Sequence, residues 1–223
     1  MSWDVVLFTV AMAALAVAAS LPVALGLAWL LARKRWPGKI LVETLVTVPL
    51  VLPPVATGFA LLMLFGKYGW LGGILEQWFG LEIVFTWKAV ILAMAVMSFP
   101  LVVRAARLGF EAVDPHLEDA ARSLGAGPWK VFWQITLPLS RRGVLAGGVL
   151  GFARALGEFG ATIVFAGNIA GRTTTIPLAI YGSVISGDNT TALEFIAVSL
   201  VLAFGAVAFG ERLVRPLPNA RSG

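Results

Sequence analysis

Two opposite charges, four residues apart in an apolar stretch, are the side chains best placed to do chemistry. Arg154 and Glu158 lie in the segment FARALGEFGAT at 152–162, and this spacing makes them neighbours on one helix face. Charges in apolar segments normally pair with each other or face a polar cavity. Arg154 would therefore either attract an anion along a pathway or form an internal ion pair with Glu158. The ion pair is favoured, because an unneutralised Glu158 would repel an anion.

Few other residues offer catalytic or ligand chemistry. The chain has no cysteine, which excludes disulfides, thiol catalysis and cysteine-ligated metals. The single histidine, His116, has no second histidine for a metal site, so we interpret it as facing solvent or a partner. No glycine-rich loop ending in lysine is present to cradle a phosphate chain. We therefore expect no enzyme activity, metal or cofactor on this chain.

The stretch from Glu111 to Arg142 carries clear helix signals. Asp114 followed by Pro115 is typical of a helix start, because an aspartate caps the first N–H groups and proline fits the first position. Glu118 and Asp119 would favour the positive end of the helix dipole. Gly125 is a natural left-handed stop. After it we expect a second amphipathic piece, ending at 137–138, whose apolar side holds Trp129, Phe132, Trp133 and Ile135.

The elements that position these residues are apolar segments. Of the 223 residues, 59% are hydrophobic and 13% charged, whereas a soluble domain has about a quarter charged. About 20 apolar residues cross a bilayer as a helix. We predict an all-α, polytopic membrane helical bundle, a single domain over 1–223. Its five spans are expected at roughly 5–31, 41–65, 87–103, 143–165 and 195–213.

Basic residues set the orientation of these spans. Most of the 17 Lys and Arg fall in the loop after the first span, the loop at 104–142 and the C-terminal tail; the tail residues are Arg212, Arg215 and Arg221. The positive-inside rule places these segments in the cytoplasm, the N-terminus outside and the C-terminus inside. The net charge of +5 is explained by these loops rather than by nucleic-acid binding. Arg154 is then the one basic residue inside a span, and its pair with Glu158 is expected near the cytoplasmic end.

Two features interrupt this regular pattern. The segment 70–85 carries Glu76 and Glu82 with Trp70 and Trp78. We favour an amphipathic helix on the outer surface over a sixth crossing. Pro53 and its neighbours interrupt the second span, either as a flexible pathway wall or as a static kink, since proline removes a backbone donor.

The loop resembles the coupling loop of permeases in ATP-binding cassette (ABC) importers. The family motif is E-A-A, three residues, G, nine residues, I-x-L-P. Here it reads Asp119-Ala120-Ala121, Gly125 and Ile135-Thr136-Leu137-Pro138, with Asp119 in place of the usual glutamate. The resemblance implies the type I importer permease fold and a loop that docks into a cytoplasmic ATPase subunit, where ATP and Mg²⁺ would bind. The coupling residues would be Glu118, Asp119, Ala120, Ala121, Gly125, Ile135, Leu137 and Pro138.

Further stretches resemble the molybdate-type permeases within that family. They lie at 152–162, 166–169 (AGNI), 175–181 (TIPLAIY), 48–54 (VPLVLPP) and 97–101 (MSFPL). The resemblance covers nearly the whole chain. It implies a permease in the bacterial inner membrane that moves molybdate or a related tetrahedral oxyanion such as tungstate. Its implied partners are membrane lipid, a second copy of itself, an ATPase subunit and an external oxyanion-binding protein.

Two other transport functions remain as alternatives. Sulfate and thiosulfate permeases share the run from Arg154 to Gly160 but diverge after it. An ion-coupled secondary transporter would use Arg154 and Glu158 as a proton relay, yet the internal inverted repeats of that class are not visible in the sequence. An intramembrane hydrolase is disfavoured, because no serine and histidine are placed to pair.

Overall fold

The computed structural model describes residues 2–214, and every regular element in that range is a helix. The longer ones are α1 (Trp3–Arg33), α2 (Lys39–Val51), α3 (Pro54–Phe65), α5 (Trp87–Glu111), α8 (Leu137–Leu156) and α11 (Asn189–Val214). The shorter ones are α4 (Trp70–Phe79), α6 (Pro115–Ser123), α7 (Pro128–Val131), η1 (Phe132–Thr136), α9 (Gly160–Phe165) and α10 (Ile176–Ser186). The all-helical architecture is the predicted one.

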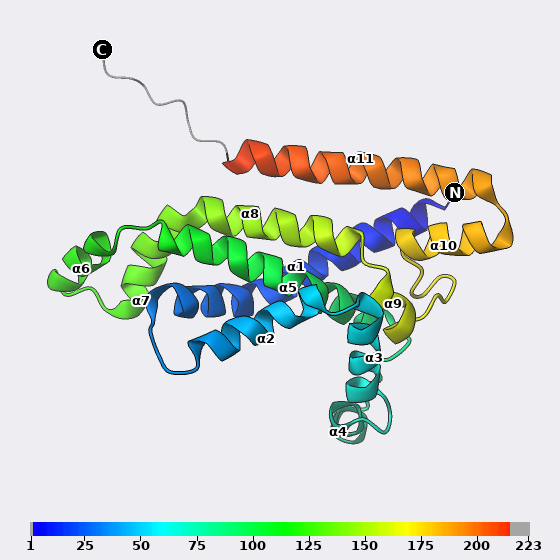
Figure 1. Cartoon of the computed structure of the whole chain (residues 1–223), viewed down its shortest axis with the longest axis horizontal. Coiled ribbons are helices and arrows are strands. Elements are labelled where there is room, and N and C mark those ends of the chain that lie inside the picture. The colour runs from blue at the N-terminus through cyan, green and yellow to red at the C-terminus, as the bar shows by residue number, and fades with distance from the viewer. Residues whose placement is uncertain (1, 215–223) are drawn as a thin grey trace, which may run out of the picture.

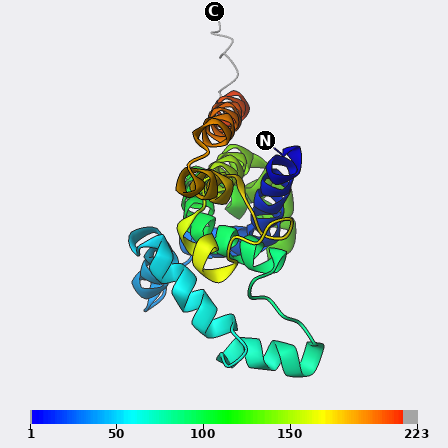
Figure 2. The same ribbon diagram turned by 90° about the vertical axis from the view of Figure 1, so that its right-hand side faces the viewer.

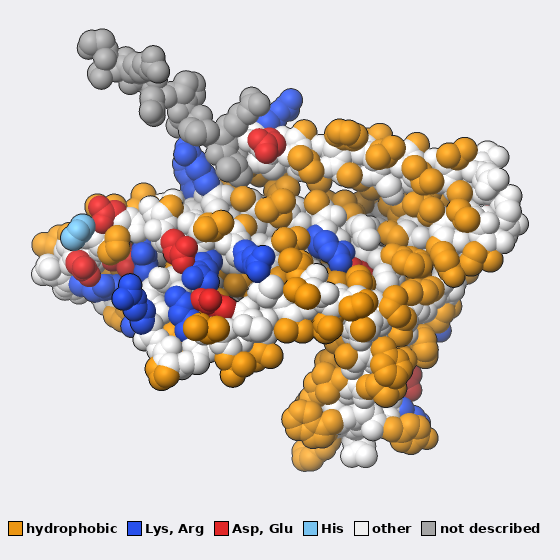
Figure 3. All heavy atoms as spheres, viewed as in Figure 1, with side chains coloured by type: hydrophobic (Ala, Val, Ile, Leu, Met, Phe, Trp, Pro, Cys, Tyr) orange, Lys and Arg blue, Asp and Glu red, His pale blue; other side chains and the backbone are white. Residues whose placement is uncertain are grey.

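The helices form an elongated bundle around α1, α5 and α8 (Figure 1). Figure 2 shows the bundle end-on, with α3 and α4 projecting from it as a side arm. One buried cluster includes Met94, Met97 and Phe165, and a second includes Leu31 and Phe110 towards the α6 end. The outer surface is largely hydrophobic along α11 and the α3–α4 arm, whereas charged side chains gather towards the α6 end (Figure 3).

Glycines let the central helices approach closely. A Cβ atom added to Gly109 of α5 would lie 2.8 Å from the Cα of Gly143 on α8, and one added to Gly147 would lie 3.0 Å from the Val102 carbonyl oxygen. Small residues at such crossings are typical of helices that pack within membranes. The α5–α8 contact is therefore built backbone against backbone.

Three helices among residues 2–214 are long and apolar enough to cross a membrane: α1, α5 and α11. The pair α2 and α3 qualifies as a fourth span if it is taken as one broken span, with a bend of 112° at Leu52 and Pro53. The five predicted spans correspond to α1, α2–α3, α5, α8–α9 and α11. The count of five therefore stays a prediction, since α8 does not qualify by itself.

Several predicted boundaries differ from the structure. α5 continues through Arg104 and Arg107 to Glu111, because Arg107 forms ion pairs with Glu43 and Glu111 at 2.8 and 2.7 Å. The connection between the helices α5 and α8 is therefore 112–136, within the predicted cytoplasmic loop 104–142. Arg104 and Arg107 lie on the part of α5 beyond the predicted span 87–103, so the expectation that Arg154 is the one basic residue within the spans stays a prediction.

A helix end was expected at Pro138. Instead, Pro138 lies in the first turn of α8, where proline is tolerated. The chain stays helical from α7 through η1 into α8. The Leu137 N–H donates to the Phe132 carbonyl, which widens this turn to a π-helix. Proline lacks the N–H that would bond to residue 134, so the wider turn fits the sequence. The second amphipathic piece is therefore continuous with the next long helix.

Two segments outside the predicted spans are also helical. α4 has 10 residues, about 15 Å at ~1.5 Å per residue, half of the ~30 Å bilayer core. It is too short for a sixth crossing. Lys67, just before α4, forms a hydrogen bond with Glu76 of α4, and this bond raises the pKa of Lys67 above its ordinary value. The Lys67 Nζ and Glu76 Oε1 atoms lie 3.2 Å apart. The second segment, α10, is an apolar helix of 11 residues that lies between the fourth and fifth predicted spans.

Candidate functional site

The candidate coupling helix α6 begins and ends as its sequence predicts. The Asp114 carboxylate accepts a hydrogen bond from the His116 N–H at 2.9 Å, and Pro115 occupies the first turn. Gly125 has φ +85°. The Gly125 N–H donates to the Arg122 carbonyl at 2.9 Å, and the Ala126 N–H to the Ala121 carbonyl at 3.0 Å. These two bonds form a Schellman motif, which requires the left-handed residue.

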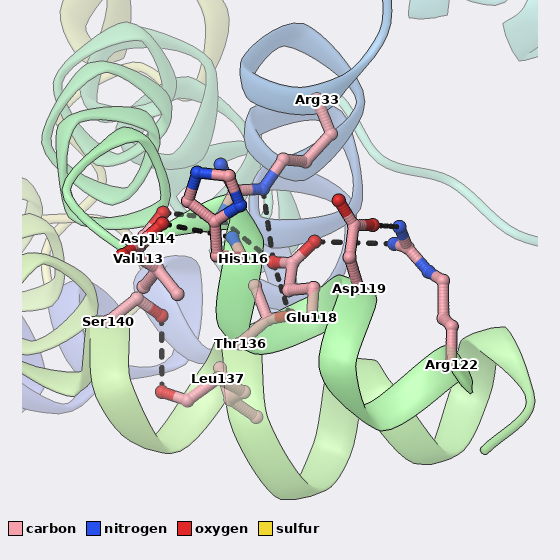
Figure 4. A network of polar contacts seen from close by, with 10 residues as sticks. All are labelled: Arg33, Val113, Asp114, His116, Glu118, Asp119, Arg122, Thr136, Leu137 and Ser140. Atoms are coloured by element: carbon pink, nitrogen blue, oxygen red, sulfur yellow. Dashed lines mark hydrogen bonds and ion pairs between the residues drawn. The ribbon is translucent and has the colours of Figure 1, made fainter. Parts of the chain in front are cut away.

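Glu118 links α6 to α1 and η1 through hydrogen bonds and an ion pair (Figure 4). Its carboxylate is 3% exposed and lies 2.8 Å from Arg33 Nη2 at the end of α1. Thr136 of η1 donates its hydroxyl to the same carboxylate at 2.8 Å, and Arg122 approaches at 3.3 Å. Arg33 also donates to the Val113 carbonyl at 2.9 Å. Charge-assisted bonds of this kind are stronger than neutral ones, so α6 is held against both α1 and η1.

The predicted role of Glu118 differs from this arrangement. The sequence assigned it to the dipole of its own helix, whereas its main partner, Arg33, lies 85 positions earlier. The sequence pattern places Arg33 in the loop after the first span, whereas the structure places it in the last turn of α1. A basic residue at the covered end of an apolar helix needs an acceptor, so this position indicates a buried acidic partner.

The opposite face of α6 is open. The Asp119 side chain is 65% exposed, and among residues 2–214 its one ion pair is with Arg122 of the same helix, at 2.8 Å. Ala120 is exposed and Ala121 is half-buried. Leu124 is 88% exposed. α6 therefore presents a small-residue surface flanked by an apolar side chain, while Glu118 points inwards.

The aromatic residues after α6 divide between core and surface. Phe132 packs against Trp29 and Phe110, with ring centroids 5.9 and 6.1 Å apart. Trp129 and Trp133 are exposed instead. The expected apolar side is therefore only partly buried: Phe132 packs into the bundle, whereas Trp129 and Trp133 lie on the surface. Ile135 and Leu137 are half-buried and Pro138 is exposed.

Arg154 and Glu158 lie at the opposite end of α8 from α6. Arg154 Nη1 is 2.7 Å from Glu158 Oε2, and Glu158 is 1% exposed. The other carboxylate oxygen accepts from the Ala161 N–H at 2.8 Å, which caps the start of α9 and explains the break in the predicted fourth span. The pair therefore lies at the end of α8 away from the loop that the sequence places in the cytoplasm.

The break before α9 lies against the break before α3. A Cβ atom on Gly58 would lie 2.6 Å from the Ala161 carbonyl oxygen, and one on Gly160 would lie 2.6 Å from the Pro54 Cβ. The two helix starts are packed without space for a side chain between them. Among residues 2–214, no group of three or more His, Cys, Asp or Glu residues is arranged to hold a metal ion.

Comparisons with known proteins agree with this geometry. Residues 7–217 match the family described as binding-protein-dependent transport system inner membrane component. The chain is 49% identical to the molybdenum transport system permease protein ModB of Escherichia coli (strain K12), covering 96% of this chain and 93% of that protein. It is 55% identical to ModB of Haemophilus influenzae, covering 82% of this chain and 81% of that protein.

More distant relatives include the sulfate transport system permease protein CysW of Synechococcus elongatus, at 36% identity over 89% of this chain and 68% of that protein. Among solved structures, the fold resembles the MetNI methionine ABC transporter with a TM-score of 0.70, 21% identity and coverage of 96% and 98%. A bacterial alginate ABC transporter gives a TM-score of 0.71 at 19% identity, with coverage of 95% of this chain and 77% of that chain. The chain belongs to the family of binding-protein-dependent transport system inner membrane components.

Proposed function

We propose that the chain is the permease subunit of an ATP-driven importer that carries molybdate, or a related tetrahedral oxyanion such as tungstate, into the cytoplasm. The observation that carries this proposal is the identity of 49–55% to molybdenum transport permeases over most of the chain. The open face of α6 supports it, because small exposed side chains allow another protein to approach the helix backbone.

The partners follow from the same proposal. An ATPase subunit binds and hydrolyses ATP and docks on α6, an external binding protein delivers the oxyanion, and two copies of this chain enclose one pathway in the inner membrane. α6 then faces the cytoplasm and the N-terminus faces outside; the two lie at opposite ends of the bundle (Figure 1). Of the basic tail residues used for orientation, Arg215 and Arg221 lie outside the described residues.

Sulfate or thiosulfate is the second candidate substrate, since sulfate permeases are among the relatives at lower identity. An ion-coupled secondary transporter is disfavoured by the site. Glu158 is buried and bonded to both Arg154 and the Ala161 N–H, so it has no open side for a proton relay.

Uptake by the reconstituted importer tests this proposal. Vesicles carrying the permease, its ATPase and its binding protein are loaded with ATP or ADP, and entry of radioactive molybdate is followed. We expect uptake only with ATP, and stronger competition from tungstate than from sulfate. Uptake that follows a proton gradient without ATP would support the secondary transporter, and preferential uptake of sulfate would support the sulfate alternative.

A further inference from the structure

A cavity between α2 and α5 lies apart from both α6 and the Arg154–Glu158 pair. Its volume is about 470 Å³, and it is lined by the polar residues Glu43, Thr44, Thr47 and Arg104 together with the apolar residues Ile40, Val48, Val51 and Leu52. This space is large enough for several water molecules, since one water needs only about 10–15 Å³ of such volume. A partly hydrated small ion therefore fits.

Arg104 supplies an uncompensated positive charge to this cavity. Among residues 2–214, its one hydrogen bond is from Nη2 to the Thr47 hydroxyl, at a long 3.4 Å, and it forms no ion pair with a carboxylate. Guanidinium carries five N–H donors in a planar fork that suits oxyanions. Most of these donors are consequently available to a ligand.

The carboxylate in the cavity wall does not cancel this charge. Glu43 lies 2.8 Å from Arg107 and 3.7 Å from Lys39, and Arg107 also pairs with Glu111 at 2.7 Å. The three cations Lys39, Arg104 and Arg107 thus lie near only two carboxylates, those of Glu43 and Glu111. Arg104 is exposed, so its excess positive charge is open to solvent or to a ligand.

Two hydroxyls lie on the same wall. Thr44 and Thr47 donate to the carbonyls of Ile40 and Glu43, each at 2.8 Å. Their oxygens are thereby fixed on the cavity side of α2, and they can act as donors only by giving up these local bonds. The cavity thus offers one strong cation and two exchangeable hydroxyls, which suits brief rather than tight retention.

We propose that Arg104, with Thr44 and Thr47, forms a transient binding site for a tetrahedral oxyanion dianion in the half of the pathway nearer α6. This inference rests on the proposed function and adds a specific place on the route. Arg154 forms the ion pair with Glu158 that the sequence favours, whereas Arg104 has no carboxylate partner among residues 2–214.

The absence of native cysteines allows a direct test. Thr44→Cys is introduced into the permease, and the complex with its ATPase is reconstituted in lipid. Its rates of reaction with an anionic and a cationic methanethiosulfonate reagent are then compared. Arg104→Gln should lower the anionic-to-cationic rate ratio about tenfold, since a nearby unit charge changes local ion concentrations by this order. Arg212→Gln, a basic residue on α11, serves as the matched control and should leave the ratio unchanged.

Protection identifies the ligand class. Millimolar molybdate should slow modification of Thr44→Cys at least threefold with Arg104 present, and should have no effect with Arg104→Gln; chloride at equal ionic strength is the control. An equal rate ratio with and without Arg104, or no protection by molybdate, would overturn the proposed site.

Uptake separates this inference from the proposed function. Arg104→Gln should reduce molybdate uptake about tenfold while Arg104→Lys retains much of it. If the unmodified importer fails to move molybdate, the proposed function fails. If it moves molybdate and Arg104→Gln does so equally well, only the Arg104 site is wrong.

Discussion

At the scale of single residues, Glu118 and Asp119 are adjacent acids with different surroundings. Glu118 is buried against Arg33 and Thr136, whereas Asp119 is mostly exposed and pairs within its own helix. Removing one partner of a buried ion pair leaves an uncompensated charge, which costs about 3–5 kcal/mol. An exposed pair contributes only about 0–1 kcal/mol.

Glu118→Gln should therefore loosen α6, and Asp119→Asn should not. We expect amide hydrogens of α6 to exchange faster by a factor of about 100 or more in Glu118→Gln, because Arg33 loses its carboxylate partner. Asp119→Asn is the matched control and should change exchange less than about fivefold. Similar exchange in the two variants would mean that Arg33 does not hold α6 in place.

The local ends of α6 were predictable from sequence, but its attachment was not. Asp114, Pro115 and Gly125 act on backbone groups within a few residues, so their effect is visible in the sequence. The contact of Glu118 with Arg33 depends on how α1 and α6 meet in space. Asp119 occupies the glutamate position of the family motif, so the sequence pattern favours it over Glu118. The fold, however, buries Glu118 and leaves Asp119 exposed.

At the scale of elements, breaks and glycine contacts shape the bundle. Pro53 predicted an interruption, but the 112° turn of α3 is set by its packing against α9, where Gly58 meets Ala161. The helix α5 extends beyond the predicted span 87–103 to Glu111. The ion pairs of Arg107 with Glu43 and Glu111 stabilise this extension, and they depend on contacts that the sequence does not show.

The crossing of α5 and α8 offers a matched pair of glycines. Gly143 faces the backbone of Gly109, whereas a Cβ on Gly148 would meet nothing within 4 Å. Gly143→Ala should destabilise the protein by about 1–3 kcal/mol through overpacking. Gly148→Ala should be neutral or slightly stabilising, because alanine is the better helix former. Thermal unfolding of the purified complex measures both; equal midpoints for the two variants would contradict the close crossing.

At the scale of the whole molecule, α11 is the least covered of the long apolar helices. Only 11% of its most apolar 18-residue window is buried, compared with 56% for α5. Lipid or another chain must cover this surface in the membrane. The proposed assembly of two identical chains around one pathway is consistent with the preference of identical subunits for closed two-fold symmetry.

Mass measurement of the intact complex tests this assembly. We expect two copies of this chain with two ATPase subunits, since a single set of these helices encloses little space for a pathway. The control is the same measurement after dissociation in denaturing detergent, which gives the mass of each chain. A complex with one copy of this chain, or with a second and different permease, would exclude the homodimer.

The central claim is that α6 transmits ATP hydrolysis to oxyanion movement. It is tested most directly by measuring molybdate uptake and ATP hydrolysis together in reconstituted vesicles, for the unmodified chain, Ala120→Trp and Gly125→Pro. Ala120 is exposed, so an indole there blocks docking without disturbing the bundle, and proline cannot adopt the φ of +85° at Gly125. We expect both variants to insert normally and to lose at least tenfold in uptake per ATP hydrolysed, whereas Arg212→Trp on α11 should not. Normal coupling in both α6 variants would contradict this claim.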